Sequence, residues 1–97
     1  VIADSQGRAF RKGAVGVAVG VAGMRPLKDL RGQKDLYGKE LRSTVVCPAD
    51  AIAAIAVLAM GEAGEGTPVV VVRGADYERG EGRIAELIRC RERDLFR

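Results

Sequence analysis

Residues 13–23 read GAVGVAVGVAG, and this stretch decides the fold class. Val15, Val17, Val19 and Val21 alternate strictly with alanine and glycine. This period of two predicts a β-strand with branched side chains on one face and almost none on the other. The bare face permits close approach by a helix, a second sheet, a partner subunit or a flat ligand, and we favour tight packing over ligand contact.

A helix is expected over residues 48–60, PADAIAAIAVLAM, with Cys47 before it and Gly61 after it. Proline is tolerated in the first helical turn, and Asp50 there suits the positive end of the helix dipole. Gly61 stands where a left-handed terminating residue is common. The absence of charge after Asp50 predicts burial on most sides, with one face formed by Ile52, Ile55, Ala56 and Ala59.

The remaining segments of the chain carry weaker secondary-structure patterns. Residues 1–3 suggest a short strand that ends in turn chemistry at residues 4–8, and the polar residues 24–44 form a long connection or a pair of short edge strands. The run of four valines at 69–72 is typical of a buried strand, and residues 82–91 suggest a second helix with Ile84, Leu87 and Ile88 inward. We therefore expect an α+β fold with one mixed sheet and two helices.

Composition restricts the chemistry. The chain has 97 residues and no histidine, so histidine-based triads and histidine zinc sites are excluded within it. Surface scaling gives roughly 5,400 Å² for a folded monomer of this mass, which allows one domain with a thin core. Because the sequence begins at Val1 without an initiator methionine, we expect it to be a piece of a longer protein.

Charge and hydropathy argue against two classes of partner. The sequence has 16 basic and 13 acidic residues, but the signs interleave from residue 73 onward and only four aromatic residues are available for stacking, so we expect no nucleic-acid binding. The apolar runs are too short to span a membrane, so we expect a soluble protein. Two widely spaced cysteines favour reduced thiols and a cytoplasmic location.

One glycine-rich segment invites a nucleotide-binding interpretation. Residues 61–66, GEAGEG, lack the Gly-Lys-Ser/Thr of a P-loop and follow a helix C-terminus, where the potential is negative. A divalent cation would reverse that sign and bridge to phosphate, and Asp4 with Ser5 offers further oxygen ligands. Each feature also has an ordinary interpretation, the first as a linker and the second as a turn.

Several blocks in order resemble the coenzyme F420-0:L-glutamate ligase family, and they cover essentially the whole chain. They are DSxGRxxRxG at 4–13, GVAVGVAGMxPLxDxRGxKD at 16–35, Thr44, Ala49-Asp50, MGEAxEGxPV at 60–69, Arg73-Gly74 and DLFR at 94–97. The match is expected to lie in the C-terminal part of the family, with the N-terminal part of the domain absent.

The resemblance implies an α+β homodimer that adds L-glutamate to coenzyme F420-0, and then γ-linked glutamate, with GTP, Mg²⁺ or Mn²⁺, and K⁺. Phosphoryl transfer to the F420-0 carboxylate would give an acyl phosphate, which the glutamate amine attacks. Such chemistry depends on positioning and on charge neutralisation by metal, and needs no histidine.

The resemblance also implies site residues, although no catalytic side chain. Asp4 resembles a ligand of the first metal, while Ser5 and Glu62 resemble ligands of the second. The family's GTP-binding loop corresponds to Met60, Gly61, Glu62, Ala63, Gly64, Glu65, Gly66 and Thr67.

Because the family's N-terminal segment carries further nucleotide and metal contacts, this chain alone is expected to be inactive. The alternative is a noncatalytic α+β dimerisation or binding module, in which the valine-glycine strand packs against a partner and the acidic loop is a linker.

Overall fold

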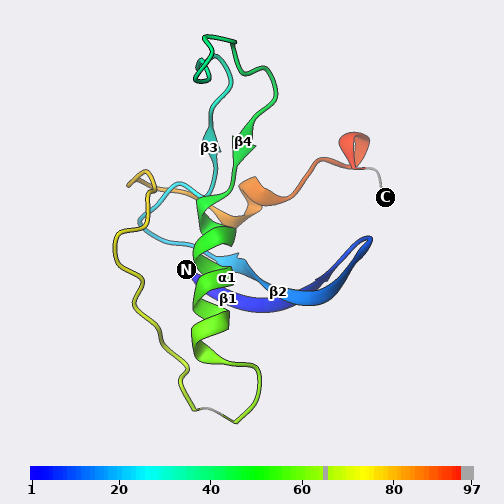
Figure 1. Ribbon diagram of the computed structural model, residues 1–97. Coiled ribbons are helices and arrows are strands. Elements are labelled where there is room, and N and C mark those ends of the chain that lie inside the picture. The colour runs from blue at the N-terminus through cyan, green and yellow to red at the C-terminus, as the bar shows by residue number, and fades with distance from the viewer. Residues whose placement is uncertain (65, 95–97) are drawn as a thin grey trace.

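The computed structural model describes residues 1–64 and 66–94, and it confirms an α+β fold (Figure 1). The elements are β1 Ile2–Arg8, β2 Arg11–Gly20, β3 Lys28–Asp29, β4 Val45–Val46, α1 Pro48–Met60 and the 3-10 helices η1 Ile84–Leu87 and η2 Arg91–Arg93. The strands form two antiparallel pairs, β1 with β2 and β3 with β4, instead of the single mixed sheet expected from the sequence. None of the helices in this part of the chain is long and apolar enough to cross a membrane.

The β1–β2 hairpin corrects the expected turn at residues 4–8. These residues are strand, and they pair with β2 so that Asp4 lies opposite Val17 and Ser5 opposite Gly16. The chain reverses after Arg8, where Phe10 adopts a φ of 62°. Strand β2 begins at Arg11 and is ten residues long. It therefore provides hydrogen-bond partners for the backbone of residues 4–8, which their turn-forming side chains would otherwise favour as a turn.

The bare face of β2 packs against α1, which confirms the expectation of tight packing. Gly16 and Ala18 are buried, and a Cβ built on Gly16 would lie 2.5 Å from the carbonyl oxygen of Ala53 and 2.7 Å from a methyl of Val57. The valines of β2 point to the opposite face, where Val19 is 52% exposed. The absence of side chains on one face therefore lets a helix lie directly on the strand.

The buried face of α1 differs from the predicted one. Ala49 and Ala53 are fully buried, whereas Ile55 is 54% and Leu58 85% exposed. The closest approach selects the smallest side chains, so the helix turns its alanines toward Gly16 and Ala18 and leaves larger aliphatic groups outside. Contrary to the prediction, helix α1 is therefore not buried on most sides by the described residues.

The core is correspondingly small, because the buried hydrophobic residues are Ala18, Met24, Ala49 and Ala53. The chain exposes 8000 Å², against roughly 5,400 Å² for a compact monomer of its mass. Much apolar surface is open in this structure.

Residues 28–46 form a protruding arm (Figure 1). The polar segment at 24–44 was expected to be either a long connection or a pair of short edge strands, and the short strands are present. Lys28 pairs with Val46 and Asp29 with Val45, and a bridge between Lys34 and Glu40 lies closer to the tip. The second strand lies just beyond the predicted segment.

Two predicted elements near the C-terminus are wrong. Residues 69–72 belong to no strand or sheet in the described part of the chain, and Val69 is 78% exposed. Residues 84–87 form only a 3-10 turn, closed by reciprocal contacts between Arg83 and Glu86. Extended backbone at Ile88 ends that turn and leaves this side chain 67% exposed, although Ile84 and Leu87 do pack against the core as predicted.

Candidate metal and nucleotide site

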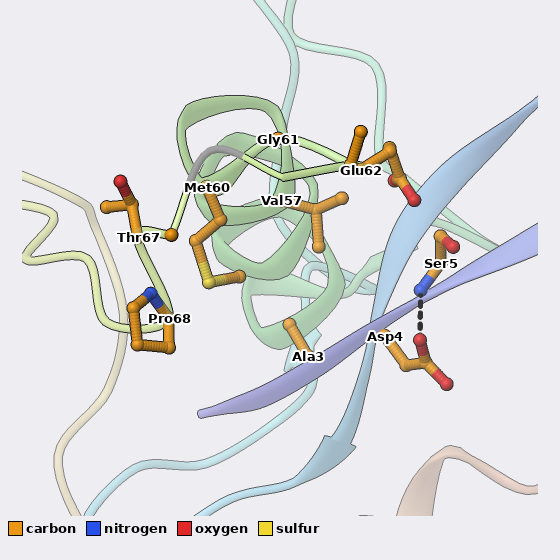
Figure 2. A pocket seen from close by; sticks show the side chains of 11 residues that line it. Ala3, Asp4, Ser5, Val57, Met60, Gly61, Glu62, Thr67 and Pro68 are labelled. Atoms are coloured by element: carbon orange, nitrogen blue, oxygen red, sulfur yellow. Dashed lines mark hydrogen bonds between the residues drawn. The ribbon is translucent and has the colours of Figure 1, made fainter.

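A hollow of about 440 Å³ lies between β1, the C-terminal end of α1 and the loop that follows it (Figure 2). It brings together two segments more than 50 residues apart in the sequence. Its described lining contains two carboxylates and no basic side chain: Ala3, Asp4, Ser5, Val57, Met60, Gly61, Glu62, Ala63, Gly66, Thr67 and Pro68.

Strand β1 separates the side chains of Asp4 and Ser5. Alternation along the strand directs Ser5, which is half-buried, toward the helix side, and leaves Asp4 exposed on the other side of the strand. Figure 2 shows the Ser5 hydroxyl on the same side of β1 as Glu62, with the Asp4 carboxylate pointing away. Asp4 Oδ1 accepts a hydrogen bond from the Ser5 N–H at 2.8 Å, which fixes the carboxylate against the strand backbone.

The end of α1 positions Glu62. Gly61 has a φ of 80° and its N–H donates to the Val57 carbonyl oxygen at 3.0 Å, so the chain leaves the helix sharply at this point. A side chain at position 61 would be strained in this conformation, which explains the glycine. Glu62 then projects from the first residue after the turn and lines the hollow.

The electrostatics of the hollow favour a cation. The last carbonyl groups of α1 carry the negative end of the helix dipole, and the carboxylates of Asp4 and Glu62 add to that potential. A bare triphosphate would be repelled here, whereas a divalent cation would be attracted and could then bridge to phosphate oxygens.

Most residues predicted from the sequence meet in this hollow. All three proposed metal ligands line it, and so do Met60, Gly61, Ala63, Gly66 and Thr67 of the predicted GTP loop. Gly64 is not among the lining residues, and Glu65 lies outside the described part of the chain.

Ala3, Val57 and Pro68 line the hollow without having been predicted. Two of them were detectable by position, because Val57 lies one helical turn before Gly61 and Pro68 directly follows the loop.

The donor atoms fit a hard divalent cation in kind, since carboxylate and hydroxyl oxygens are the ligands that Mg²⁺ and Mn²⁺ prefer. They do not make a complete site by themselves. Within residues 1–64 and 66–94, no group of three or more cysteine, aspartate or glutamate side chains lies close enough to hold a metal. A metal ion held here would therefore need further ligands.

Comparison with known proteins identifies the family. The model of the F420-0:Gamma-glutamyl ligase family matches residues 1–74, about three quarters of the chain. The chain belongs to this family. Proteins named coenzyme F420:L-glutamate ligase match it over its full length: those of Methanocaldococcus jannaschii, Methanothermobacter thermautotrophicus and Archaeoglobus fulgidus are 54%, 52% and 53% identical to it.

The chain spans only 39% of the length of each of these three ligases. The comparisons thus confirm the resemblance to the F420-0:gamma-glutamyl ligase family across the chain. They do not support the narrower expectation that the match lies in the C-terminal part of the family.

Proposed function

We propose that this chain is part of a ligase that joins L-glutamate to coenzyme F420-0, and that the 440 Å³ hollow holds metal-bound GTP phosphates. The observation that carries the proposal is the meeting of Asp4 and Ser5 on β1 with Glu62 after α1 in one electronegative hollow. The names of the relatives support the ligase chemistry and both substrates.

The reaction proposed for the whole ligase has two steps. A carboxylate oxygen of F420-0 attacks the γ-phosphorus of GTP, so that the bond to the β-phosphate oxygen breaks and GDP leaves. The α-amine of glutamate then attacks the acyl carbon, inorganic phosphate leaves, and the amine loses a proton as the amide forms. A divalent metal would supply charge neutralisation on the phosphate oxygens.

The alternation along β1 gives its two oxygen ligands different roles. Ser5 and Glu62 share one side of the strand, so they would hold one cation together. Asp4 points to the other side, where it would hold a separate cation with ligands from outside this chain. The division agrees with the assignment of Asp4 to one metal and of Ser5 and Glu62 to another.

The glycine-rich loop at residues 60–67 would enclose the nucleotide. The positive φ values of Gly61 and Gly66 let the backbone turn closely at both ends of the loop. Its neighbouring acids repel phosphate in the absence of metal, so GTP binding should depend on the divalent cation.

Other properties of the ligase are part of the same proposal. We expect use of K⁺, extension of F420-0 by γ-linked glutamate, a homodimer and a cytoplasmic location. The incomplete metal coordination supports inactivity of this chain on its own, because the remaining ligands must come from the part of the ligase that it does not span.

A chimera tests the proposal. The chain would replace the matching 97 residues of the M. jannaschii ligase, and amide formation would be followed by mass spectrometry with F420-0, L-glutamate, GTP and Mn²⁺. We expect glutamylated F420 from the chimera, and none from the chain alone or without GTP. A folded chimera that binds neither GTP nor Mn²⁺ would overturn the proposal.

The same experiment separates the ligase from a noncatalytic dimerisation or binding module. The bare face of the valine-glycine strand, which that alternative assigned to a partner, is covered by α1. The exposed apolar surface that could serve such a module instead is the tip of the arm, where Leu36 is 98% and Tyr37 93% exposed. A binding module would associate through this surface without any dependence on metal or GTP.

A further inference from the structure

Residues 69–72, four consecutive valines, have the exposure pattern of a strand but no strand partners among the described residues. Val69 and Val71 are 78% and 75% exposed, whereas Val70 and Val72 are half-buried. This alternation is that of a β-strand with one covered face. The segment runs back along α1 after the loop (Figure 1).

The backbone of this segment is unpaired in the described part of the chain. Among residues 1–64 and 66–94, no hydrogen bond involves an N–H or C=O group of residues 69–72, whereas every named strand pairs with a neighbour. Extended backbone flanked by branched apolar side chains is a template for strand addition. Backbone groups so placed are normally paired once apolar surface closes around them.

We propose that residues 69–72 form a β-strand that pairs with a strand from the part of the ligase polypeptide that this chain does not span. That part amounts to about three fifths of the relatives' length. The exposed surface, 8000 Å² against roughly 5,400 Å² for a compact monomer, includes large apolar side chains that such a partner would cover. The partner strand is apolar and uncharged, because it meets a run of four valines.

A second copy of the chain is a weaker candidate for this edge. Pairing between two copies of the segment would join two strands of four residues, and an isolated two-stranded pair of that length is marginal in water. A strand that already belongs to a sheet in the rest of the ligase gives the segment a stable neighbour.

A hollow of about 230 Å³ beneath the segment agrees with this completion. It separates the inner valines from α1 and is lined by Val70, Val72, Ile52 and Ala56, together with Val1, Ala22, Gly23, Met24 and Tyr77. Val70, Val72, Ile52 and Ala56 form the apolar part of this lining, and apolar side chains beside the incoming strand would pack against them.

Strand pairing would also anchor the loop at residues 60–67. The loop is held at its first end by the hydrogen bond from Gly61 to Val57. At its other end, Thr67 and Pro68 lead directly into the unpaired valines. Pairing of residues 69–72 would fix that end of the loop. The importance of this for nucleotide binding rests on the proposed function, whereas the strand pairing itself does not depend on it.

Amide hydrogen exchange tests the pairing without GTP or metal, so its failure is distinguishable from failure of the ligase proposal. The isolated chain would be compared with the chimera in which it replaces the matching residues of the M. jannaschii ligase. We expect alternate amides of residues 69–72, or all of them, to be protected at least about a hundredfold more in the chimera. Equal exchange in the two proteins would overturn the proposal, and so would protection in the isolated chain that rises with its concentration, which indicates a second copy.

Proline substitutions test which backbone groups pair. Adjacent residues of a strand direct their N–H groups to opposite edges, so V70P removes a donor from one edge and V71P from the other. We expect one of the two variants, or both, to reduce the folded chimera at least about tenfold, with V71T as the matched control that keeps the N–H and the branched shape. Wild-type folding of both proline variants would overturn the proposal.

Discussion

Asp50 Oδ1 accepts a hydrogen bond from the N–H of Ala18 at 2.9 Å, and this contact ties the first turn of α1 to β2 across 32 residues of sequence. Asp50 also lies at the positive end of the helix dipole. In the same turn, the Cys47 Sγ accepts from the Asp50 N–H at 3.4 Å. The start of the helix is thus fixed both to the sheet and to the arm that precedes it.

Removal of this contact should destabilise the chain measurably. D50A leaves the Ala18 N–H without its acceptor in a partly buried place, so we expect a loss of about 1–3 kcal/mol in the free energy of unfolding. D50N keeps an acceptor oxygen and should lose less. Urea unfolding followed by circular dichroism gives both values, and a D50A midpoint equal to that of the wild type would contradict the role assigned to Asp50.

The close contact between helix and strand predicts a large effect at a single glycine. G16A places a methyl group 2.5 Å from the Ala53 carbonyl oxygen, and backbone cannot yield cheaply, so we expect a loss of about 1–3 kcal/mol in stability. G7A is the matched control, because a Cβ at Gly7 meets nothing within 4 Å. Thermal unfolding compares the two variants, and equal melting temperatures would contradict the packing.

The base of the arm should respond to acid at an unusually low pH. Hydrogen bonds from the Arg31 side chain and N–H lower the pKa of Asp29 to about 2 from 3.8, and the Arg31 guanidinium lies 2.6 Å from the Asp29 carboxylate. Because this pKa is depressed in the folded state, the stabilisation is fully present above the ordinary pKa and is lost as pH falls from about 4 to about 2.

Carbon-13 NMR of the Asp29 carboxyl group measures this titration. We expect a midpoint near 2 in the wild type and a return toward 3.8 in R31Q. A wild-type midpoint that coincides with that of R31Q would show that the pair does not form in solution.

The two free thiols should differ in reactivity. Cys90 is exposed, whereas Cys47 is half-buried at the start of α1, and desolvation by burial raises the pKa of the Cys47 thiol. We expect iodoacetamide at pH 8 to modify Cys90 at least about tenfold faster. Rates measured on C47S and C90S assign each phase, and faster modification of Cys47 would contradict its placement.

The sequence predicted the strong local patterns correctly. The alternation over residues 13–23 marked β2 and its bare face, and Pro48 with Gly61 marked both ends of α1. Each of these signals acts within a few residues, which is why it can be interpreted without a structure.

The predictions that were wrong depended on distant partners. Asp4 and Ser5 have turn chemistry, but β2 draws them into a strand. The large aliphatic residues of α1 suggested its inner face, but Ala53 and Val57 make the contact with Gly16, and Ile55 lies outside. The valines at 69–72 have strand composition, yet the described chain offers them no neighbouring strand.

The candidate site also combines features that could be predicted from the sequence with others that only the fold reveals. Residue type and the family resemblance suggested Asp4, Ser5 and Glu62 as metal ligands, and the fold brings them to one hollow. The side of β1 that each side chain faces could be seen only in the structure: Asp4 points to one side, and Ser5 points to the other side together with Glu62.

The most direct test of the central claim is Mn²⁺ binding to the ligase chimera in the presence of GTP, followed by electron paramagnetic resonance. We expect D4N and E62Q each to weaken binding by about tenfold or more, while E40Q, which removes a carboxylate on the arm, leaves it unchanged. If D4N, E62Q and E40Q bind Mn²⁺ with the same affinity as the wild type, the hollow between β1 and α1 is not the metal site.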